Sequence, residues 1–294
     1  MAKTMGPASG FFPGWDEDRA ENNPALELLH TSGSGFTCLY RSRSGGRNRL
    51  YKVLSSKCRG DMLYESLLRK EFEIGYSLTH PGICAYQAFC TWEGMGNAIE
   101  MEWIEGCTLR EWLQRNPSVK QREAVLDELL EALAYMHRKQ VVHRDLKPDN
   151  VMITDRGSHV KLIDFGFSDS DAHAINKGAA GTREYAAPEL LEGKATDQRS
   201  DIWSLGRILQ ELLPRYGRIS RRCMAENPDK RYSDVAALQK AVAWRRRLWM
   251  LPAALLFLML LFVAWHFRTY SEADVDALVR EAEDAISATI SSAE

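Results

Sequence analysis

The stretch VVHRDLKPDNVMI, Val141 to Ile153, decides the fold of this 294-residue chain. It brings carboxylate, ammonium, guanidinium, imidazole and amide side chains into one short polar segment. An amphipathic helix is predicted just before it, over Arg122–Lys139, because apolar residues recur there at helical spacing, and an apolar strand follows. By its composition alone the stretch could also be a chance polar loop.

The segment resembles the catalytic loop of eukaryotic-type (Hanks-type) protein kinases, because residues 143–150 match the pattern H-R-D-L-x-x-x-N in full. Further stretches resemble that family's later motifs: KLIDFGFS with Asp164-Phe165-Gly166, GTREYAAPELL with Ala187-Pro188-Glu189, SDIWSLG, and NPDKRY with Arg231. The resemblance covers residues 25–244. It implies an α+β class, two-lobed protein-kinase-like fold with a small β-rich N-terminal lobe and a larger helical C-terminal lobe.

Hydrophobic patterning along the chain agrees with these two halves. Short strands are expected within residues 25–55, a helix over Asp61–Leu78, and β-like segments over Ile83–Thr91 and Asn97–Trp103. From Leu109 onward the sequence is mostly helical.

The resemblance implies that the chain uses ATP and Mg²⁺, with each role carried over from the family. Asp145 would position the substrate hydroxyl and accept its proton, and Lys147 would stabilise charge on the γ-phosphate. Asn150 and Asp164 would offer the hard oxygen ligands that Mg²⁺ prefers. These residue types are needed because phosphoryl transfer depends mainly on positioning and charge stabilisation.

Lys52 is the only lysine of the strand-like run RLYKVL, and the resemblance implies that it binds the α- and β-phosphates. A partly buried lysine needs a counter-charge. Glu71 is the expected partner, because it stands ten residues before Pro81, where the family places its helix glutamate. Glu73 is the alternative.

The turn HTSGSGFTCLY, His30 to Tyr40, is predicted to be the nucleotide loop, although it lacks some glycines of the family pattern G-x-G-x-x-G-x-V. Two registers fit. One takes Gly33 and Gly35 as the first two glycines and Cys38 as the third. We prefer the other, which keeps both apolar positions and a family-like distance to Lys52. The predicted nucleotide-binding residues of this loop are Ser32, Gly33, Ser34, Gly35, Phe36, Thr37 and Leu39, with Ser32, Ser34 and Thr37 at the glycine positions.

The stretch IEMEWIEGCTL, Ile99 to Leu109, resembles the hinge between the lobes. Met101 would close the back of the adenine pocket, and the backbone of Glu102, Trp103 and Ile104 would pair with the adenine edge. A plain edge strand is the alternative.

Two departures from the family pattern concern regulation and substrate docking. Between Asp164 and Thr182 the only hydroxyl residues are Ser168 and Ser170, so the family's usual phosphorylation position, which Arg144 would bind, is missing. A neighbouring aspartate, or another activation route, would have to replace it. The stretch Trp203–Arg231 is also shorter than is typical of the family, which leaves substrate recognition open.

Composition limits the remaining classes. The formal net charge of −2 supplies no basic excess, so no nucleic-acid partner is expected. The six cysteines show no C-x-x-C pairing and are scattered, which favours reduced thiols over a zinc site or disulfide framework. Residues 1–24 are rich in Gly, Pro and acidic residues and are expected to be a flexible leader.

Residues 248–267, LWMLPAALLFLMLLFVAWHF, carry no formal charge. At about 1.5 Å per residue they reach roughly 30 Å, the thickness of the hydrocarbon core, which predicts a single transmembrane helix in a lipid bilayer. A buried core helix is the alternative. Arginines 245–247 precede the run, and Arg268 and Arg280 are the only basic residues after it. This bias favours a cytoplasmic kinase domain and an extracytoplasmic C-terminus.

Residues 268–294 are expected to form a short acidic extracytoplasmic tail. Ser271 and Asp274 resemble a capping box at a helix start. Helical spacing places apolar residues on one face: Val275, Leu278, Val279, Ala282 and Ile286. Because so short a helix is marginal alone, this face would either self-associate or bind a partner, or the tail would remain solvated.

These features predict a membrane-anchored serine/threonine protein kinase that transfers the ATP γ-phosphate to Ser or Thr hydroxyls of protein substrates. A lysine two residues after the catalytic aspartate is the family's serine/threonine signature, and Lys147 stands two residues after Asp145. The alternative is a pseudokinase scaffold that binds nucleotide or partners without transfer, which the glycine-poor loop motivates.

Overall fold

A computed structural model describes residues 26–32, 34–44, 46–92, 94–166 and 183–291, except for the side chains of residues 44, 248–254, 269–273 and 288–291. The expected leader, Gly33, Ser168 and Ser170 therefore lie outside the described residues. The chain divides into two units, Met1–Gln239 and Lys240–Glu294.

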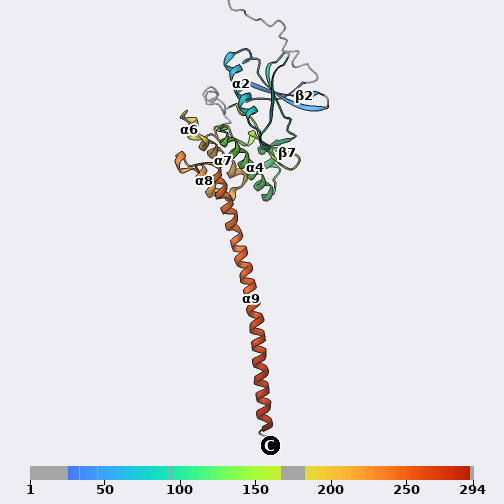
Figure 1. Cartoon of the computed structure of the whole chain (residues 1–294), viewed down its shortest axis with the longest axis vertical. Helices are drawn as coiled ribbons and strands as arrows, with labels where there is room; N and C mark the ends of the chain where they lie inside the picture. The colour runs from blue at the N-terminus through green and yellow to red at the C-terminus, as the bar shows by residue number, and fades with distance from the viewer. Residues whose placement is uncertain (1–25, 33, 45, 93, 167–182, 292–294) are drawn as a thin grey trace, which may run out of the picture. The chain divides into compact units, whose positions relative to one another are not determined.

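The N-terminal part of the first unit is an antiparallel five-stranded sheet in the order β1-β2-β3-β5-β4 (Figure 1). Its strands are β1 Leu26–Thr31, β2 Thr37–Ser44, β3 Arg47–Leu54, β4 Tyr86–Trp92 and β5 Gly96–Met101. At the reversal between β2 and β3, Gly46 has φ of +74°, a left-handed conformation that glycine adopts without strain. The predicted β-rich N-terminal half is thus confirmed.

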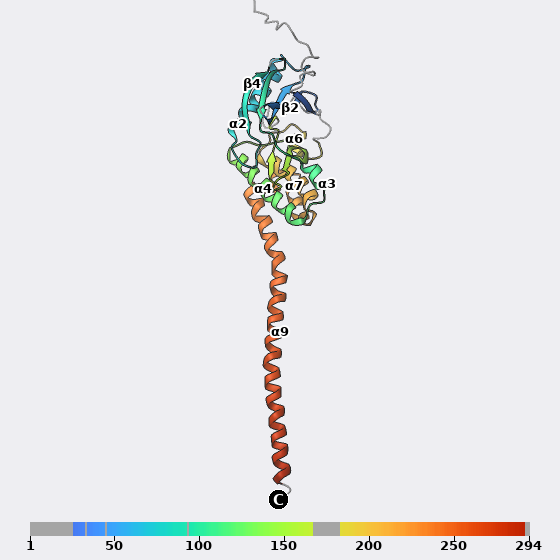
Figure 2. The ribbon, with the colours of Figure 1, turned by 90° about the vertical axis from the view of Figure 1, so that its right-hand side faces the viewer.

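Helix α2, Met62–Ser77, lies beside β4 of this sheet (Figure 2). It begins where Asp61 accepts a hydrogen bond from the Leu63 N–H at 2.8 Å, which satisfies one orphan donor of the first turn. The helix buries Leu68 and Glu71. It follows the predicted helix over Asp61–Leu78 to within a residue at each end.

The rest of the first unit is mainly helical and confirms the two-part α+β prediction. Its helices are α3 Leu109–Gln114, α4 Val119–Arg138, α6 Pro188–Leu191, α7 Gln198–Leu212 and α8 Gly217–Cys223, with 3-10 turns at Pro148–Asn150, Pro214–Tyr216 and Pro228–Lys230. A three-stranded sheet accompanies them, in the order β6 Gly106–Thr108, β7 Val151–Thr154, β8 Val160–Leu162.

Helix α4 starts a few residues before its predicted beginning at Arg122. Ser118 and Gln121 form a capping box there, which the periodicity of apolar residues does not reveal. The helix buries Leu129 and Leu133, so its apolar stripe faces the core as predicted. The polar segment 143–150 follows α4 and leads directly into β7.

The last helix, α9, runs from Val235 to Ser291. It continues through Ser271 without interruption, so the predicted new helix start there is wrong. Within the part of the chain that the structure describes, no helix combines the length and the apolar character needed to cross a membrane. The side chains of 248–254, at the start of the predicted membrane segment, lie outside that part.

Candidate active site

Three charged side chains from distant parts of the chain meet in the first unit. The Lys52 Nζ atom on β3 lies 2.7 Å from Glu71 Oε1 on α2 and 2.7 Å from Asp164 Oδ1, two residues after β8. Lys52 and Glu71 are 7% and 5% exposed, so both carry their charge inside the protein. Lys52 therefore joins the small lobe to the segment that carries the predicted metal ligand, and Glu71 rather than Glu73 is its partner.

Burial and neighbouring charges shift the pKa values of these groups in different directions. Burial lowers the pKa of Lys52, but the Asp164 and Glu71 carboxylates outweigh it and raise the pKa above its usual value. Burial, together with the nearby Asp164 carboxylate, raises the pKa of Glu71 above its usual value even though Lys52 lowers it. For Asp164, Lys52 outweighs burial and brings the pKa to about 2, so this carboxylate is ionised at neutral pH.

Tyr86 supports this cluster and was missed in the sequence. Its hydroxyl donates to Glu71 Oε1 at 2.9 Å, and its ring lies 5.5 Å from the ring of the buried Phe165. Gly75 makes room for the tyrosine, because a Cβ atom there would lie 2.6 Å from the Tyr86 ring. The sequence does not show that Tyr86 and Gly75 are in contact, so the role of this tyrosine could not be predicted from it.

Asp145 lies in the loop between α4 and β7 and is 4% exposed. Its Oδ2 atom accepts hydrogen bonds from Lys147 Nζ at 2.7 Å and Asn150 Nδ2 at 2.9 Å. Its Oδ1 atom is buried without a hydrogen-bond partner among the described residues. A buried carboxylate oxygen without a donor retains its capacity to accept a hydrogen bond, such as one from a substrate hydroxyl. Burial raises the pKa of Asp145, although Lys147 lowers it.

Asp201 on α7, a second residue missed in the sequence, holds the loop that was predicted to be catalytic. This fully buried side chain accepts hydrogen bonds from the backbone N–H groups of His143 and Arg144, each at 2.8 Å. Its Oδ2 atom also lies 2.8 Å from His137 Nε2 on α4. The hydrogen bonds of His137 and the nearby His143 outweigh burial and keep the pKa of Asp201 below its usual value. Asp201 belongs to the motif SDIWSLG, so the sequence did mark the residue. Its hydrogen-bond partners depend on how α7 packs against α4 and the loop, which the motif does not reveal.

The residues predicted to bind Mg²⁺ fit that ion. The Asn150 amide nitrogen donates to Asp145, which leaves the amide oxygen for a cation, and Asp164 is an ionised carboxylate. Within the described residues no group of three or more His, Cys, Asp or Glu side chains could hold a metal by itself. An amide oxygen and a carboxylate suit a cation that nucleotide phosphates also bind.

The pairing of β2 with β3 bears on the register of the nucleotide loop. Leu39 is the cross-strand partner of Lys52, so both side chains lie on the same face of the sheet. Cys38 and Tyr40 instead pack against the cluster around Tyr51, on the other face. This arrangement favours the register with Leu39, rather than Tyr40, at the valine position.

The turn between β1 and β2 is closed by its own polar groups. The Ser32 Oγ atom accepts from the Thr37 N–H at 3.1 Å, and the Gly35 N–H donates to the Ser32 carbonyl at 2.7 Å. Gly35 takes up the left-handed conformation, with φ of +74°. Thr37 lies in β2 and Phe36 packs against Tyr64 of α2, with ring centroids 4.9 Å apart. Ser34 Oγ lies 3.1 Å from Ser32 Oγ.

The predicted hinge begins where β5 ends at the buried Met101. The Glu102 N–H donates to the Ala85 carbonyl at 2.9 Å, and the ring of Trp103 stacks with Arg41 at 5.4 Å. Ile104 continues the irregular segment before β6. The sheet therefore ends at Met101, and the backbone from Glu102 to Ile104 is not a strand, which favours the hinge over the edge-strand alternative.

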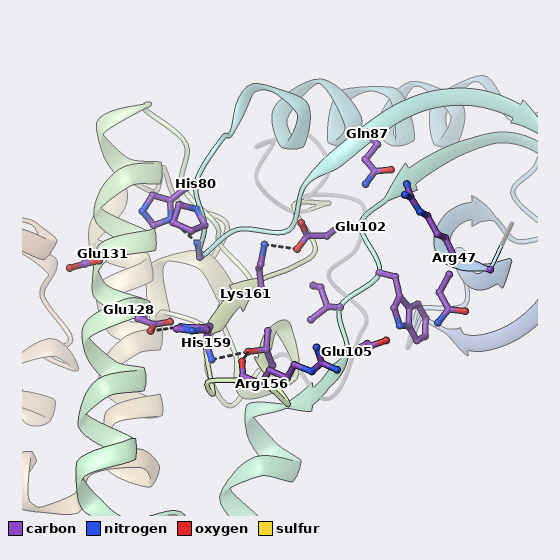
Figure 3. A pocket seen from close by; sticks show the side chains of 17 residues that line it. Arg47, His80, Gln87, Glu102, Glu105, Glu128, Glu131, Arg156, His159 and Lys161 are labelled. Atoms are coloured by element: carbon purple, nitrogen blue, oxygen red, sulfur yellow. Dashed lines mark hydrogen bonds and ion pairs between the residues drawn. The ribbon is translucent and has the colours of Figure 1, made fainter. Parts of the chain in front are cut away.

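A cavity of about 1060 Å³ lies beside this hinge (Figure 3). Glu102 points into it and forms an ion pair with Lys161 of β8 at 2.6 Å, and His159 pairs there with Glu128 at 2.9 Å. Neither the Lys52 cluster nor Asp145 lines it. Successive side chains of a strand point to opposite faces, and the neighbours of Lys161 on β8 are both buried. Lys161 therefore lies on the opposite face from those buried side chains. The cavity is thus separate from the candidate catalytic cluster.

Comparisons with known proteins agree with this geometry. The protein kinase domain family matches residues 31–243. The probable serine/threonine-protein kinase SCO3848 of Streptomyces coelicolor is 36% identical over 181 residues, which are 57% of this chain and 26% of that protein. The serine/threonine-protein kinase PknB of Mycolicibacterium smegmatis is 32% identical over 199 residues, 64% of this chain and 31% of that protein.

The chain spans less than a third of the length of these two relatives. Among solved structures, the crystal structure of the Mycobacterium tuberculosis PknI kinase domain superposes with a TM-score of 0.56 at 23% identity, covering 74% of this chain and 94% of that one. That likeness concerns the two-lobed fold.

Proposed function

This chain belongs to the protein kinase domain family, and from that premise we propose that it transfers the γ-phosphate of ATP to serine or threonine hydroxyls of protein substrates. The observation that carries the proposal is the contact of Lys52 with both Glu71 and Asp164, each at 2.7 Å. The Lys52–Glu71 pair is the one that an active protein kinase requires, and the contact with Asp164 joins it to the predicted metal ligand.

Mg-ATP, when bound, supplies the phosphoryl group and the cation that neutralises its charge. The chain's own residues would do the rest. Lys52, held by Glu71, would position the phosphates, and Asn150 and Asp164 would hold the cation. The Oδ1 atom of Asp145, which has no hydrogen-bond partner among the described residues, would accept the hydrogen bond and then the proton of the substrate hydroxyl. Lys147, 2.7 Å from Asp145, would stabilise charge on the transferred group.

The predicted nucleotide contacts remain part of this proposal. The loop from Ser32 to Leu39 would cover the phosphates, and the hinge backbone from Glu102 to Ile104 would bind the adenine edge. The two relatives described above are named as serine/threonine-protein kinases, and nothing in the comparisons favours the pseudokinase alternative.

The test is transfer of labelled γ-phosphate from Mg-ATP to an unspecific protein acceptor such as casein by the purified full chain, followed by phosphoamino-acid analysis. Phosphoserine or phosphothreonine is the expected product. The variant Asp145→Asn should lose about 10²–10⁴-fold in rate, the contribution typical of a general base, while it still binds ATP.

The matched control for that variant is Asp155→Asn, which removes an exposed carboxylate in a 3.9 Å ion pair with Arg115. It should transfer phosphate like the wild type. A wild-type chain that binds ATP without transferring it would instead support the scaffold alternative, and unimpaired transfer by Asp145→Asn would remove that residue from the mechanism.

We further propose that residues 248–267 anchor the chain in a lipid bilayer, with the kinase domain in the cytoplasm and residues 268–294 outside. Support comes from the uncharged apolar run and from the arginine bias on its N-terminal side. Within α9, side chains such as Leu255, Phe262 and Phe267 are more than half exposed, so they have no apolar cover of their own. The apolar face at Leu278 and Val279 is proposed to self-associate.

Protease added outside spheroplasts that hold a C-terminally tagged chain tests this arrangement. We expect the tag to be lost, the kinase domain to be protected, and the chain to stay with membranes after carbonate washing. Release of the chain by carbonate would contradict anchoring, and a protected tag would contradict the orientation.

A further inference from the structure

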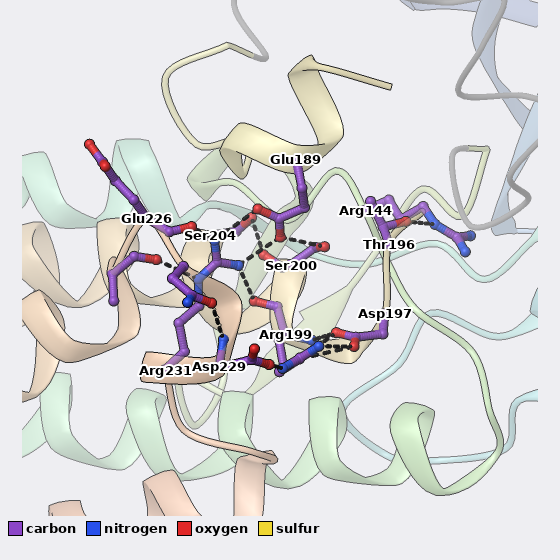
Figure 4. A network of polar contacts seen from close by, with 12 residues as sticks. Arg144, Glu189, Thr196, Asp197, Arg199, Ser200, Ser204, Glu226, Asp229 and Arg231 are labelled. Carbon is purple, nitrogen blue, oxygen red and sulfur yellow. Dashed lines mark hydrogen bonds and ion pairs between the residues drawn. The ribbon is translucent and has the colours of Figure 1, made fainter. Parts of the chain in front are cut away.

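Arg144, the residue before Asp145, contacts a threonine that no kinase motif of the chain includes. Its Nε atom donates to Thr196 Oγ1 at 3.1 Å (Figure 4). The backbone of Arg144 has φ of +62°, and its N–H is held by Asp201. The guanidinium that reaches Thr196 therefore belongs to a residue whose backbone is fixed next to the catalytic carboxylate.

Thr196 ends an exposed segment between two anchored helices. Residues 191–195 are exposed, and Thr196 itself is partly exposed. On one side, Glu189 of α6 forms a double ion pair with Arg231, at 2.7 and 2.8 Å (Figure 4). On the other side, α7 begins directly after Asp197. The segment can thus present a hydroxyl to another molecule without disturbing the helices that flank it.

The charges around Thr196 suit an added phosphate. A phosphate brings about −1.5 to −2 charges and three acceptor oxygens, and arginine is its preferred partner. The neighbouring Asp197 carboxylate is already compensated, because it accepts from the Arg199 N–H at 2.8 Å and from the Arg199 side chain at 2.9 Å. The start of the α7 helix adds a favourable dipole.

We propose that Thr196 is a phosphorylation site, that a second copy of this chain phosphorylates it, and that the phosphate pairs with Arg144. The proposal rests on the kinase function proposed above. In the reaction a bond forms between Thr196 Oγ1 and the γ-phosphorus of ATP, and the bond from that phosphorus to the β,γ-bridging oxygen breaks. ADP leaves, and the hydroxyl proton passes to Asp145 of the acting copy.

The consequence is control of the catalytic loop. Pairing with a phosphate replaces the hydrogen bond from the Arg144 guanidinium to a neutral hydroxyl with hydrogen bonds between two ionised groups, which are stronger. Since Asp145 is the next residue, we expect the catalytic rate constant to rise while the KM for ATP changes little. The segment between Asp164 and Thr182 lacks a hydroxyl residue at the family's usual phosphorylation position. Phosphorylation of Thr196 would take over that regulatory role.

The test starts from full-length chain treated with phosphatase and then incubated with Mg-ATP. Mass spectrometry should find phosphate on Thr196, and the kcat for casein should rise about tenfold, the effect of about 1.4 kcal/mol in the transition state. Wild-type kinase should also phosphorylate Thr196 of the Asp145→Asn chain, which cannot act on itself.

Variants separate this role from a structural one. Thr196→Val should show no rise in kcat, whereas Thr196→Ser should restore both the phosphate and the rise. Thr91→Val, which removes an exposed hydroxyl bonded to Asn97, should behave like the wild type. In Arg144→Gln, Thr196 should gain phosphate without any gain in kcat. Thermal unfolding of each variant checks that it is folded.

Casein phosphorylation without phosphate on Thr196 would overturn the proposal while leaving the kinase function intact. Phosphate on Thr196 with unchanged kcat, or a normal rise in Thr196→Val, would also overturn it. No transfer to any acceptor would overturn the kinase function, and this proposal with it.

Discussion

At the scale of single residues, Lys52 compensates the charge of two carboxylates, the buried Glu71 and the partly exposed Asp164. Glu71 otherwise has only the Tyr86 hydroxyl as a described hydrogen-bond donor, and Asp164 has the Gly166 N–H at 3.3 Å. Removing one partner of a buried ion pair costs more than the pair itself contributes, because the remaining charge stays buried.

We therefore expect Lys52→Met to lose nearly all phosphoryl transfer and to unfold more easily by about 3–5 kcal/mol at neutral pH. The pKa of Glu71 is already raised by burial and would rise further without the lysine. A carboxyl with a raised pKa in the folded state destabilises the protein as pH rises through that pKa. The stability deficit should therefore be smaller near about pH 5 than near about pH 8.

Urea unfolding at both pH values measures this deficit, with Lys120→Met on the exposed side of α4 as the matched control. The control should be nearly neutral at both. A deficit in Lys52→Met that does not shrink at the lower pH would show that Glu71 is not the group left uncompensated.

At the scale of elements, the packing of helix α2 against Tyr86 of β4 depends on Gly75, which has no side chain. Gly75 faces the ring of Tyr86, which in turn donates to Glu71. Glycine inside a helix normally costs about 0.5–1 kcal/mol relative to alanine. At this position the close approach to Tyr86 reverses that preference.

We expect Gly75→Ala to destabilise the chain by about 1–3 kcal/mol through overpacking, and to lower kcat by displacing Tyr86 and hence Glu71. The matched control is Gly217→Ala at the start of α8, where a Cβ atom would meet nothing within 4 Å. Denaturation and kinase assays on both variants check this. Equal behaviour of the two variants would show that α2 moves freely enough to absorb the methyl group.

At the scale of the whole kinase domain, Asp201 joins α7 to both α4 and the catalytic loop. We expect Asp201→Asn to cost about 1–3 kcal/mol for each buried donor that it leaves without an acceptor, and to lower kcat far more than it raises the KM for ATP. The carboxylate's lowered pKa means that its contribution to stability is present near neutral pH and is lost as pH falls through that pKa.

The matched control is Asp229→Asn, whose carboxylate is 79% exposed in an ion pair with Arg199. It should change stability by less than about 1 kcal/mol. Circular dichroism melts and steady-state kinetics at several ATP concentrations separate the two expectations. A larger effect on KM than on kcat in Asp201→Asn would place its role in nucleotide binding.

Local patterns in the sequence were sufficient for the order and type of the elements. The helices at Met62–Ser77 and Val119–Arg138 follow from apolar spacing, because a helix that packs on a core must place such residues on one stripe. The catalytic segment was recognisable because its residues stand close together in the chain. The start of α4 was misplaced, since its cap at Ser118 lies outside the apolar pattern.

The sequence alone therefore determined the two-part fold and the residue types of the site. The tertiary structure decided which of them meet: Lys52 and Asp164 are 112 positions apart, and Arg144 and Thr196 are 52 apart. It also identified Tyr86 and Asp201, whose partners no local pattern names. Periodicity specifies which face of an element is buried, but the opposing side chains depend on how separate elements pack, and only the folded chain sets that packing.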